Sequence, residues 1–235
     1  MRWFWRASAH DARYLMQMTP PDCSDQTEDW AATAEARVLD QAIRLAPALH
    51  WNDGLAKAAA RAAGLSDADA ALLLPNGAKD LAALLFRRHD QAALLALAPL
   101  DAPAMKVRAK IQAAVSSRIE AAMADEAATK CAAAYLLVHP ALGASLSWAT
   151  ADGLWRWAGD TATDENHYSK RAILSAVLLS TLAARLAGGR AAGEAHLAAR
   201  IGNVMAFEKW KAGLPTPVGL AREAAGWLGR LRYGA

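Results

Sequence analysis

Apolar positions along the chain recur at helical spacing, and short groups of proline, glycine and capping residues separate them into segments. The first long segment covers residues 30–46. It places Val38, Ala42, Ile43 and Ala46 on one face, as an amphipathic helix does. The proline that follows predicts the end of this helix.

Two shorter helices follow the first. Asn52 or Asp53 provides an N-cap for a helix that stops at Gly64, and Ser66 with Asp69 forms a capping-box pattern that opens the next. Pro-Asn-Gly at residues 75–77 predicts the turn that ends it.

The later segments predict six further helices. The one before Gly188-Gly189 is apolar on nearly every side over residues 173–186, which favours a place in the middle of a bundle. The predicted helices cover residues 78–98, 104–123, 126–138 and 141–158, then the helix that ends at the glycine pair, then residues 191–211.

Composition agrees with an all-α fold. Alanine occupies 61 of the 235 positions, whereas valine and isoleucine together occupy 12, so intrinsic propensity favours helix over strand. A hydrophobic content of 54% with 21% charged residues excludes disorder of the whole chain. Cys23 and Cys131 are too few for a disulfide framework, which indicates a reducing compartment.

No segment meets the length of a membrane-spanning helix by a simple count. The longest strongly apolar run, residues 172–184, has 13 residues between Arg171 and Arg185, short of the roughly 20 that a bilayer requires. Residues 1–29 lack the apolar core of a signal peptide and are interpreted as a disordered leader. Met16 and Met18 are alternative translation starts.

The positive charge of the chain is concentrated at its C-terminal end. The net charge is +3, and residues 200–235 alone carry six basic and two acidic side chains. After a proline-rich linker, the last segment places one apolar stripe beside arginines, a pattern typical of an interfacial helix. The predicted membrane-binding residues are Leu220, Arg222, Ala224, Trp227, Leu228, Arg230 and Leu231. The alternative is a terminal helix folded back on the body or on a dimer partner.

Residues 63–88 resemble the N-terminal helix-turn-helix of TetR-type regulators. Their predicted recognition helix, however, carries Asp67 and Asp69, and Ala71 stands near the position of a phosphate-contacting tyrosine. Carboxylates repel DNA phosphates, so we expect a helix-turn-helix kept for packing and no binding to nucleic acid. The alternative is a ligand-responsive transcriptional repressor.

The most specific motif lies between two predicted helices. Residues 158–171 read AGDTATDENHYSKR, an apolar helix follows, and residues 200–209 read RIGNVMAFEK. With residues 73–91 and 105–121, these segments resemble the accessory lipid-binding family of ubiquinone biosynthesis known as the ninth coenzyme Q factor. The resemblance covers roughly residues 36–211.

The resemblance implies a TetR-like helical fold without DNA binding and an internal pocket for an isoprenoid lipid. It also implies presentation of quinone intermediates to partner enzymes, chiefly the demethoxyubiquinone hydroxylase. Glu165 and His167 depart from the family's common TDFNWY pattern, so any partner contact made by aromatic residues at these two positions is altered in this chain.

Two groups of residues follow as candidate sites. The motif places a polar rim at the start of an apolar helix, a plausible docking surface, whose candidate partner-binding residues are Asp160, Asp164, Asn166, Tyr168, Lys170 and Arg171. The alternative is a capped helix corner in which Asp164 pairs with Arg171.

Small residues among large ones leave room for a ligand, and the candidate lipid-binding residues are Leu136, Leu137, Leu154, Trp155, Val177, Leu178 and Leu182. The alternative is a solid core.

No pattern of a catalytic site is present in the sequence. The six histidines are scattered without a zinc or di-iron spacing, and the phosphate-binding and nucleophile motifs are absent. The sequence therefore predicts a protein that is not an enzyme and has no metal or cofactor. Residues 87–90, Arg-Arg-His-Asp, are interpreted as a solvated face.

Together these patterns predict an all-α, TetR-like bundle of about ten helices. The expected regions are a leader (1–29), a helix-turn-helix subdomain with a connecting helix (30–98), a lipid-binding bundle (99–213) and a linker with an amphipathic helix (214–235). We expect a homodimer through the late helices. The expected location is cytoplasmic, peripheral on the inner membrane of a bacterial-type cell.

Overall fold

The computed structural model describes residues 23–161 and 165–212, and for residues 23–29, 165–166 and 205–212 it describes the backbone alone. All regular structure in these residues is helical, so the fold class is all-α, as predicted. The described residues form eight α-helices and one 3-10 helix: α2 (Cys23–Leu49), α3 (Asp53–Ala62), α4 (Asp67–Leu73), α5 (Ala78–Leu97), η1 (Ala102–Ala104), α6 (Val107–Ala124), α7 (Glu126–Leu137), α8 (Pro140–Trp157) and α9 (Glu165–Ala212).

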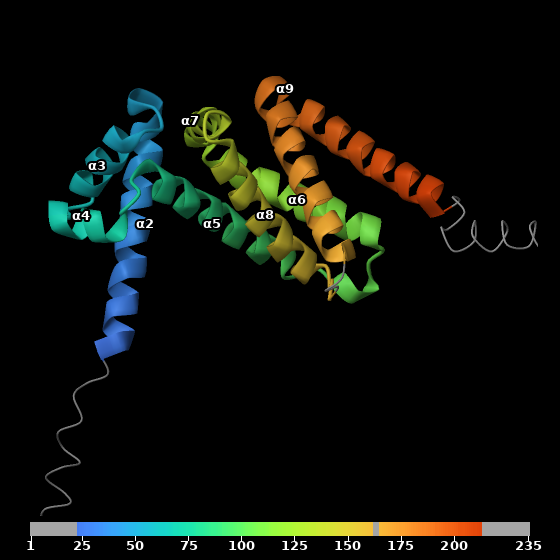
Figure 1. Ribbon diagram of the computed structural model, residues 1–235, viewed down its shortest axis with the longest axis horizontal. Coiled ribbons are helices and arrows are strands. Elements are labelled where there is room, and N and C mark those ends of the chain that lie inside the picture. The colour runs from blue at the N-terminus through green and yellow to red at the C-terminus, as the bar shows by residue number, and fades with distance from the viewer. Residues whose placement is uncertain (1–22, 162–164, 213–235) are drawn as a thin grey trace, which may run out of the picture. The chain divides into compact units, whose positions relative to one another are not determined.

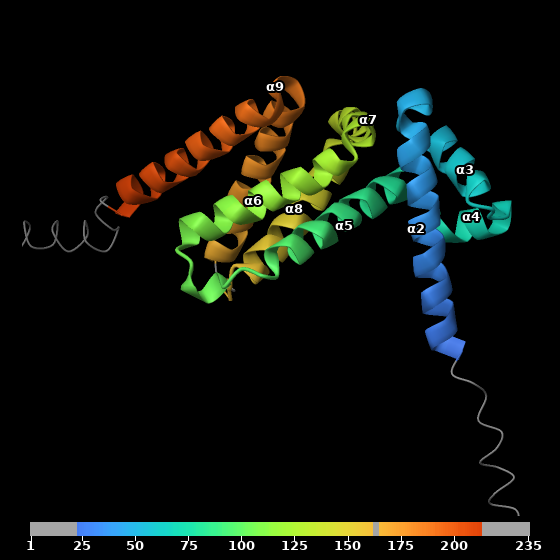
Figure 2. The same cartoon turned by 180° about the vertical axis from the view of Figure 1, so that it is seen from behind.

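The chain divides into two compact units, and the boundary between Leu84 and Leu85 lies inside α5. The first unit holds α2, α3, α4 and the beginning of α5, and the second holds the rest of α5 with α6 to α9 (Figures 1 and 2). The predicted regions placed all of this helix in the first one, residues 30–98. Its later half belongs to the second because Leu97 is part of that unit's core.

Capping side chains start the short helices of the first unit where the sequence predicts. Asn52 Oδ1 accepts a hydrogen bond from the backbone nitrogen of Leu55 at 3.0 Å. Ser66 Oγ accepts one from the backbone nitrogen of Asp69 at 3.1 Å. Gly64 lies between α3 and α4 with a φ of +80°, a conformation that glycine adopts without steric cost. The predicted helix, turn and second helix are therefore confirmed.

The first long helix does not end where proline predicted. The helix α2 continues through Pro47 to Leu49, so the prediction that Pro47 ends it is wrong. A proline in the last turn removes one backbone donor but does not prevent the turn from closing. The amide of His50 donates to the Ala46 carbonyl at 2.9 Å, and His50 then adopts a left-handed φ of 57°. This change of backbone direction ends the helix.

The core of the second unit is made of aliphatic side chains from four helices. The central members are each at most 4% exposed: Leu97 of α5, Val115 of α6, Leu154 of α8, and Leu174 and Leu197 of α9. Full burial of each such side chain contributes about 1.5–3 kcal/mol to stability. These contacts fix the helices that surround the candidate site.

The helix α9 consists of two arms that meet at Gly189, where φ is 76° and ψ is −168°. The arm after this residue turns back, as the change of direction of the orange ribbon in Figure 1 shows. A side chain at Gly188 would bring its Cβ within 2.6 Å of the Ala192 Cβ, so the tight turn requires glycine there. The predicted break at the glycine pair is confirmed.

The first arm of α9 is buried on one face only. Leu174, Val177 and Leu178 are buried, whereas Leu179 is 42% exposed. The prediction of a helix surrounded on all sides by the bundle is therefore wrong. Its second apolar face is free of core packing because the helices opposite it carry small side chains, as described below.

By length and composition, the segment His167–Val204 of α9 is long and apolar enough to cross a membrane, although the 13-residue count had excluded such a segment. In its most apolar window, 22% of the residues are buried. Two features are those of a helix packed in a bundle: Gly189 interrupts it, and Arg185 bonds to Glu120 of α6 at 3.4 Å.

Candidate functional site

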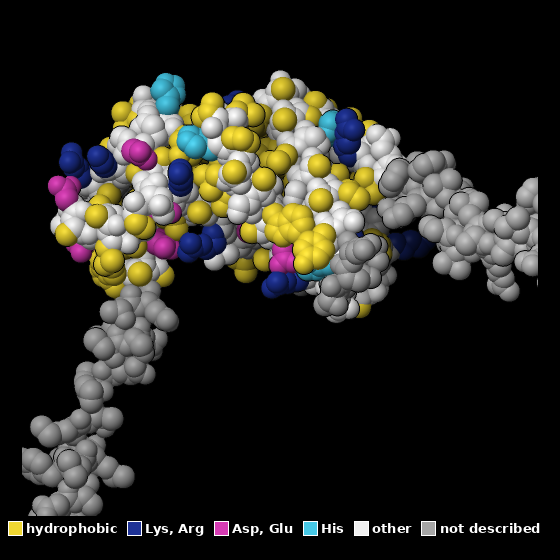
Figure 3. Space-filling view, viewed as in Figure 1, with side chains coloured by type: hydrophobic (Ala, Val, Ile, Leu, Met, Phe, Trp, Pro, Cys, Tyr) yellow, Lys and Arg dark blue, Asp and Glu magenta, His cyan; other side chains and the backbone are white. Residues whose placement is uncertain are grey.

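The second unit contains a largely apolar cavity of about 590 Å³ between α5, α6, α7, α8 and α9. Cavities of roughly 300–1,000 Å³ are the size that binds small organic ligands in proteins. Most of the wall consists of alanine and leucine side chains, and its apolar members are Leu85, Phe86, Ala122, Ala132, Ala133, Ala134, Leu136, Leu137, Pro140, Gly143, Ala144, Leu179, Leu182, Ala183 and Leu186. Figure 3 shows hydrophobic side chains gathered over α7, α8 and the first arm of α9.

Small side chains on α7 and α8 create this space. The run Ala132 to Ala134 on α7, with Gly143 and Ala144 on α8, lies opposite the large leucines of α9. A Cβ added at Gly143 would lie 3.6 Å from the Leu136 Cβ, an ordinary van der Waals contact, so α7 and α8 lie close together at the wall. The small residues that the sequence interleaves among the leucines of α9 contribute less to this room. Ala183 lines the cavity, whereas Ala172, Ser175, Ala176, Ser180 and Thr181 do not.

The structure divides the seven candidate lipid-binding residues into two groups. Leu136, Leu137 and Leu182 line the cavity. The others lie in or against the core: Leu154, Val177 and Leu178 are core members, and Trp155 packs on it. Trp155 also donates from Nε1 to the Lys170 carbonyl at 3.1 Å. The sequence period identifies an apolar face, but it does not tell which part of that face meets a neighbour and which meets a void.

Four polar side chains interrupt the apolar wall: His89, Arg118, Thr129 and Lys130. Arg118 is 5% exposed, its Nε lies 2.5 Å from Asp90 Oδ1, and its guanidinium lies 5.1 Å from the centre of the Phe86 ring. Lys130 pairs at the surface with Glu126 at 2.7 Å. Thr129 Oγ1 donates to the Ala122 carbonyl at 2.8 Å.

His89 is neutral at physiological pH. Burial, together with the positive charge of Arg118, lowers its pKa to about 4, although a contact of 3.0 Å between its Nε2 and Asp125 Oδ2 opposes the shift. Burial raises the pKa of Asp90, whereas the hydrogen bonds from Arg118 and Thr150 act to lower it. The polar part of the wall therefore includes one uncharged imidazole and one arginine whose aspartate partner lies outside the wall.

The interpretation of residues 87–90 as a solvated face is wrong for half of them. Arg87 is exposed, but His89 is 3% exposed and Asp90 is partly buried against Arg118. The helical period contained the signal, because the fourth residue before His89 and the fourth after it, Leu85 and Ala93, are both buried. On α6 the buried positions Ala114, Val115 and Ile119 bracket Arg118 in the same way.

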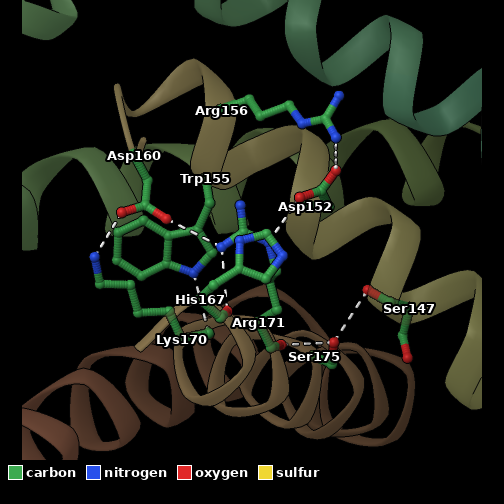
Figure 4. A network of polar contacts seen from close by, with 9 residues as sticks. All are labelled: Ser147, Asp152, Trp155, Arg156, Asp160, His167, Lys170, Arg171 and Ser175. Carbon is green, nitrogen blue, oxygen red and sulfur yellow. Dashed lines mark hydrogen bonds and ion pairs between the residues drawn. The ribbon is translucent and has the colours of Figure 1, made fainter. Parts of the chain in front are cut away.

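A second polar cluster joins the end of α8 to the start of α9. The Arg171 side chain is 2% exposed and lies between two carboxylates: its Nε donates to Asp152 Oδ1 at 2.6 Å and its Nη1 to Asp160 Oδ2 at 3.0 Å (Figure 4). Lys170 Nζ pairs with the other oxygen of Asp160 and lies 5.4 Å from the centre of the Trp155 ring. Hydrogen bonds thus hold the two helices together across the described ends of the connection.

Ion pairing outweighs burial at Asp160. Burial of this carboxylate works to raise its pKa, but the hydrogen bonds from Lys170 and Arg171 are stronger and hold the pKa below the usual value. Asp160 and Arg171 are therefore charged at neutral pH. Both are buried, 7% and 2% exposed, so they contribute to structure more than to an exposed contact surface.

The six candidate partner-binding residues have different environments. Asp160, Lys170 and Arg171 form the cluster, whereas Tyr168 is 64% exposed. Asp164 and the side chain of Asn166 lie outside the described residues. The alternative from sequence was a local pair between Asp164 and Arg171. In the structure, Arg171 contacts the carboxylates of Asp152 and Asp160. Asp152 was missed because it lies 19 residues before its arginine on another helix.

An exposed aromatic group lies beside this cluster. The Tyr168 ring centre is 6.3 Å from that of Trp148 on α8 and 5.2 Å from that of His167. Ser175 of α9 donates to the Ser147 carbonyl of α8 at 3.2 Å, one turn further along both helices (Figure 4). The buried cluster therefore positions an aromatic surface formed by Trp148, His167 and Tyr168.

The helix-turn-helix of the first unit presents acid where DNA binding needs base. Asp67 at the start of α4 is 87% exposed, and Arg61 lies 3.7 Å from it. Asp69 is half-buried, and its carboxylate accepts a hydrogen bond from the Ser66 hydroxyl at 2.6 Å. The solvent-facing surface of α4 is therefore acidic, and Arg61 offsets part of its negative charge.

Two points raised by the sequence remain: the candidate membrane-binding residues and the possibility of a metal site. The membrane-binding candidates, Leu220, Arg222, Ala224, Trp227, Leu228, Arg230 and Leu231, lie outside the described residues. Within residues 23–161 and 165–212, no group of three or more histidine, cysteine or acidic side chains could hold a metal ion.

Comparison with known proteins bears on the wall of the cavity and on the α8–α9 corner. No curated protein matched the chain. Residues 141–208, which span most of α8 and α9, match the family model described as COQ9. The matched stretch includes Arg171 and its two carboxylates, Tyr168, and the leucines of α9 that line the cavity. The resemblance to the family of the ninth coenzyme Q factor, first identified from the sequence motif, is therefore confirmed over residues 141–208, and it supports a role in ubiquinone biosynthesis.

Proposed function

We propose that this protein is a non-catalytic accessory factor of ubiquinone biosynthesis that binds an isoprenoid or quinone lipid in the cavity of its second unit. The observation that carries the proposal is a largely apolar cavity whose α8 and α9 walls fall inside the COQ9 match. The partners of the polar wall residues are carboxylates that do not line the cavity, or in the case of Thr129 a backbone carbonyl, an arrangement suited to carriage.

The size of the cavity suits a lipid tail. An apolar cavity of about 150 Å³ accommodates one benzene molecule, so 590 Å³ provides roughly four times that space. An isoprene unit has nearly as many carbon atoms as benzene, and several units therefore fit. Leu137 is 83% exposed while lining the cavity, which provides an apolar edge over which a tail can enter.

Mass spectrometry of lipid extracted from the gently purified full-length chain tests this function. We expect an isoprenoid or quinone in the wild type and its loss in Ala133→Phe, because a ring at this lining position fills the cavity. The matched control is Ala127→Phe, an exposed position on the same helix that does not line the cavity. Absence of any such lipid from the wild type would overturn the proposal.

The aromatic surface formed by Trp148, His167 and Tyr168 is the proposed contact for the demethoxyubiquinone hydroxylase. Its support is the large exposed fraction of Tyr168 and a buried cluster that holds it in place. We expect Tyr168→Ala to weaken binding of the purified hydroxylase at least tenfold, since exposed tyrosines often dominate interfaces. Arg108→Ala, an exposed change on α6 that does not line the cavity, is the control. Equal binding by both variants would remove this surface from the proposal.

Membrane attachment is proposed for residues 214–235, with the protein peripheral on the cytoplasmic face of the inner membrane. The support is the basic, amphipathic pattern of the sequence. Removal of residues 216–235 is expected to abolish co-sedimentation with anionic vesicles. Unchanged co-sedimentation of the shortened chain would contradict the assignment.

A homodimer through the late helices is part of the same proposal, and sedimentation equilibrium measures it.

The alternative function, a ligand-responsive repressor, is disfavoured by the acidic α4. Asp67 is 87% exposed there and Asp69 is half-buried, and both carboxylates would lie near phosphates in a helix-turn-helix complex. A gel-shift assay with the upstream DNA of the gene is expected to show no retardation. Sequence-selective retardation by the wild type would favour the repressor instead.

A further inference from the structure

We propose that the polar part of the wall at Arg118 and His89 binds the head of the ligand inside the cavity, and that this head is neutral and carries hydrogen-bond-accepting oxygens, as a quinone or methoxyphenol does. The inference rests on the proposed function and adds to it which end of the lipid the protein recognises. It assigns Arg118 as the donor to the head and Asp90 as the residue that positions Arg118.

Arg118 has unused donors at the cavity. A guanidinium carries five N–H groups, and among the described residues the hydrogen bond of Arg118 is made by Nε alone, to Asp90. The side chain is 5% exposed and lines the cavity, as does Phe86, over which its guanidinium lies. A ligand oxygen in the cavity would supply the missing acceptor.

Arg118 is held in position from outside the cavity. Both carboxylate oxygens of Asp90 lie 2.9 Å from Thr150 Oγ1 and share its single hydroxyl proton, and one of them also accepts a hydrogen bond from Arg118. Neither Asp90 nor Thr150 lines the 590 Å³ cavity. The carboxylate therefore orients the guanidinium from behind, while the Nη groups are left for a ligand.

The charge balance of the wall selects a neutral head. Arg118 is already paired with Asp90, Lys130 is paired with Glu126, and His89 is uncharged at neutral pH. An anionic head would add an uncompensated buried charge, which is unfavourable in an apolar cavity. Carbonyl, ether or phenol oxygens accept hydrogen bonds from a guanidinium without adding charge.

Three ligands with ten-carbon tails distinguish the possibilities on the full-length, delipidated wild type: decylubiquinone, the headless hydrocarbon decane, and undecanoic acid, chosen so that the tails match. Their competition against a fluorescent apolar dye gives relative affinities. We expect decylubiquinone to bind about tenfold to 100-fold more tightly than decane, the range for a hydrogen bond to a charged group. Equal affinities, or tighter binding of undecanoic acid, would overturn the inference while leaving lipid binding intact.

Variants connect the preference to Arg118. The double change Asp90→Asn with Arg118→Met removes both charges, so no unpaired carboxylate is left buried, and it is expected to abolish the preference for decylubiquinone over decane. Arg108→Met is the control, because Arg108 is exposed on the same helix. A preference that persists in the double variant would overturn the inference. If none of the three ligands binds the wild type, the proposed function itself fails, and the inference fails with it.

Discussion

Two buried arginines of the second unit have contrasting surroundings. Arg171, at the α8–α9 corner, donates to two carboxylates and to the His167 carbonyl. Arg118, at the cavity, is almost as buried but donates to one carboxylate only. Both have an acidic partner from another helix.

The difference separates structural from binding roles. Burial of a charge costs several kcal/mol, which hydrogen bonds and ion pairs must offset. At Arg171 the protein itself supplies the partners, so the residue joins two helices. At Arg118 it supplies fewer, and the remaining donors lie beside a void that a ligand can enter. Equal burial therefore does not imply an equal role.

Arg171→Met should produce the largest loss of stability. The substitution leaves Asp152 and Asp160 without the cation between them, and breaking such a buried pair costs about 3–5 kcal/mol. Urea unfolding monitored by circular dichroism measures it. Arg156→Met is the control, because Arg156 is 74% exposed and its bond to Asp152 should contribute less than about 1 kcal/mol. Equal losses in both variants would show that burial of the pair has no effect.

The pH dependence of stability should report His89. Its pKa is about 4 in the folded protein and near 6.5 in the unfolded chain, so between these values the unfolded chain binds more protons. Stability should therefore fall as the pH is lowered from 6.5 to 4, by up to about 1.4 kcal/mol per pH unit and about 3 kcal/mol in total.

Arg118 and Arg88 add to this sensitivity of His89, and Asp125 opposes it. His89→Gln should flatten the curve in the same window, whereas His196→Gln, a change on the second arm of α9, should not. Urea unfolding at several pH values measures both. An unchanged slope in the His89 variant would show that this imidazole is not held neutral by the fold.

Arg118→Met should destabilise the protein by about 1–3 kcal/mol, less than Arg171→Met. The reason is that Asp90 keeps its hydrogen bonds from Thr150 and its side chain is 27% exposed, so water can reach the carboxylate. Adding Asp90→Asn should recover part of the loss. Thermal unfolding of the two variants gives the comparison, and a loss as large as that of Arg171→Met would contradict the distinction drawn between the two arginines.

Thr150→Val should have the smallest effect, about 1 kcal/mol. The hydroxyl donates to Asp90 but lies behind Arg118, so its loss removes one buried hydrogen bond and loosens the carboxylate. In a double-mutant cycle with Arg118→Met, the two changes should be coupled. Additive effects, measured by urea unfolding, would show that Thr150 does not support the arginine.

Local sequence predicted the helices and their boundaries well where a single residue determines the end. Asn52 and Ser66 cap their helices, and Gly189 breaks α9, because each acts through its own backbone and near neighbours. Pro47 gave a wrong helix end because the helix ends through the left-handed conformation of His50, three residues later. A proline in the last turn costs a helix little stability.

The candidate site was only partly predictable from sequence. His89 and Arg118 lie in phase with buried positions, so the helical period could have shown that they face inward. Their partners Asp125 and Asp90 could not be found this way, since the pairs join different helices. Likewise, the motif around residues 158–171 contained Asp160 and Arg171 but gave no sign of Asp152 as their companion.

The sequence by itself determined an all-helical chain, the places where its helices start and stop, and a resemblance that the COQ9 match confirms over residues 141–208. These properties depend on propensity, caps and residue patterns close together in the chain. Only the tertiary structure decided which apolar faces meet a core and which meet a cavity, and which arginine has all its partners. Those outcomes depend on the volumes and charges that distant helices bring to the same place.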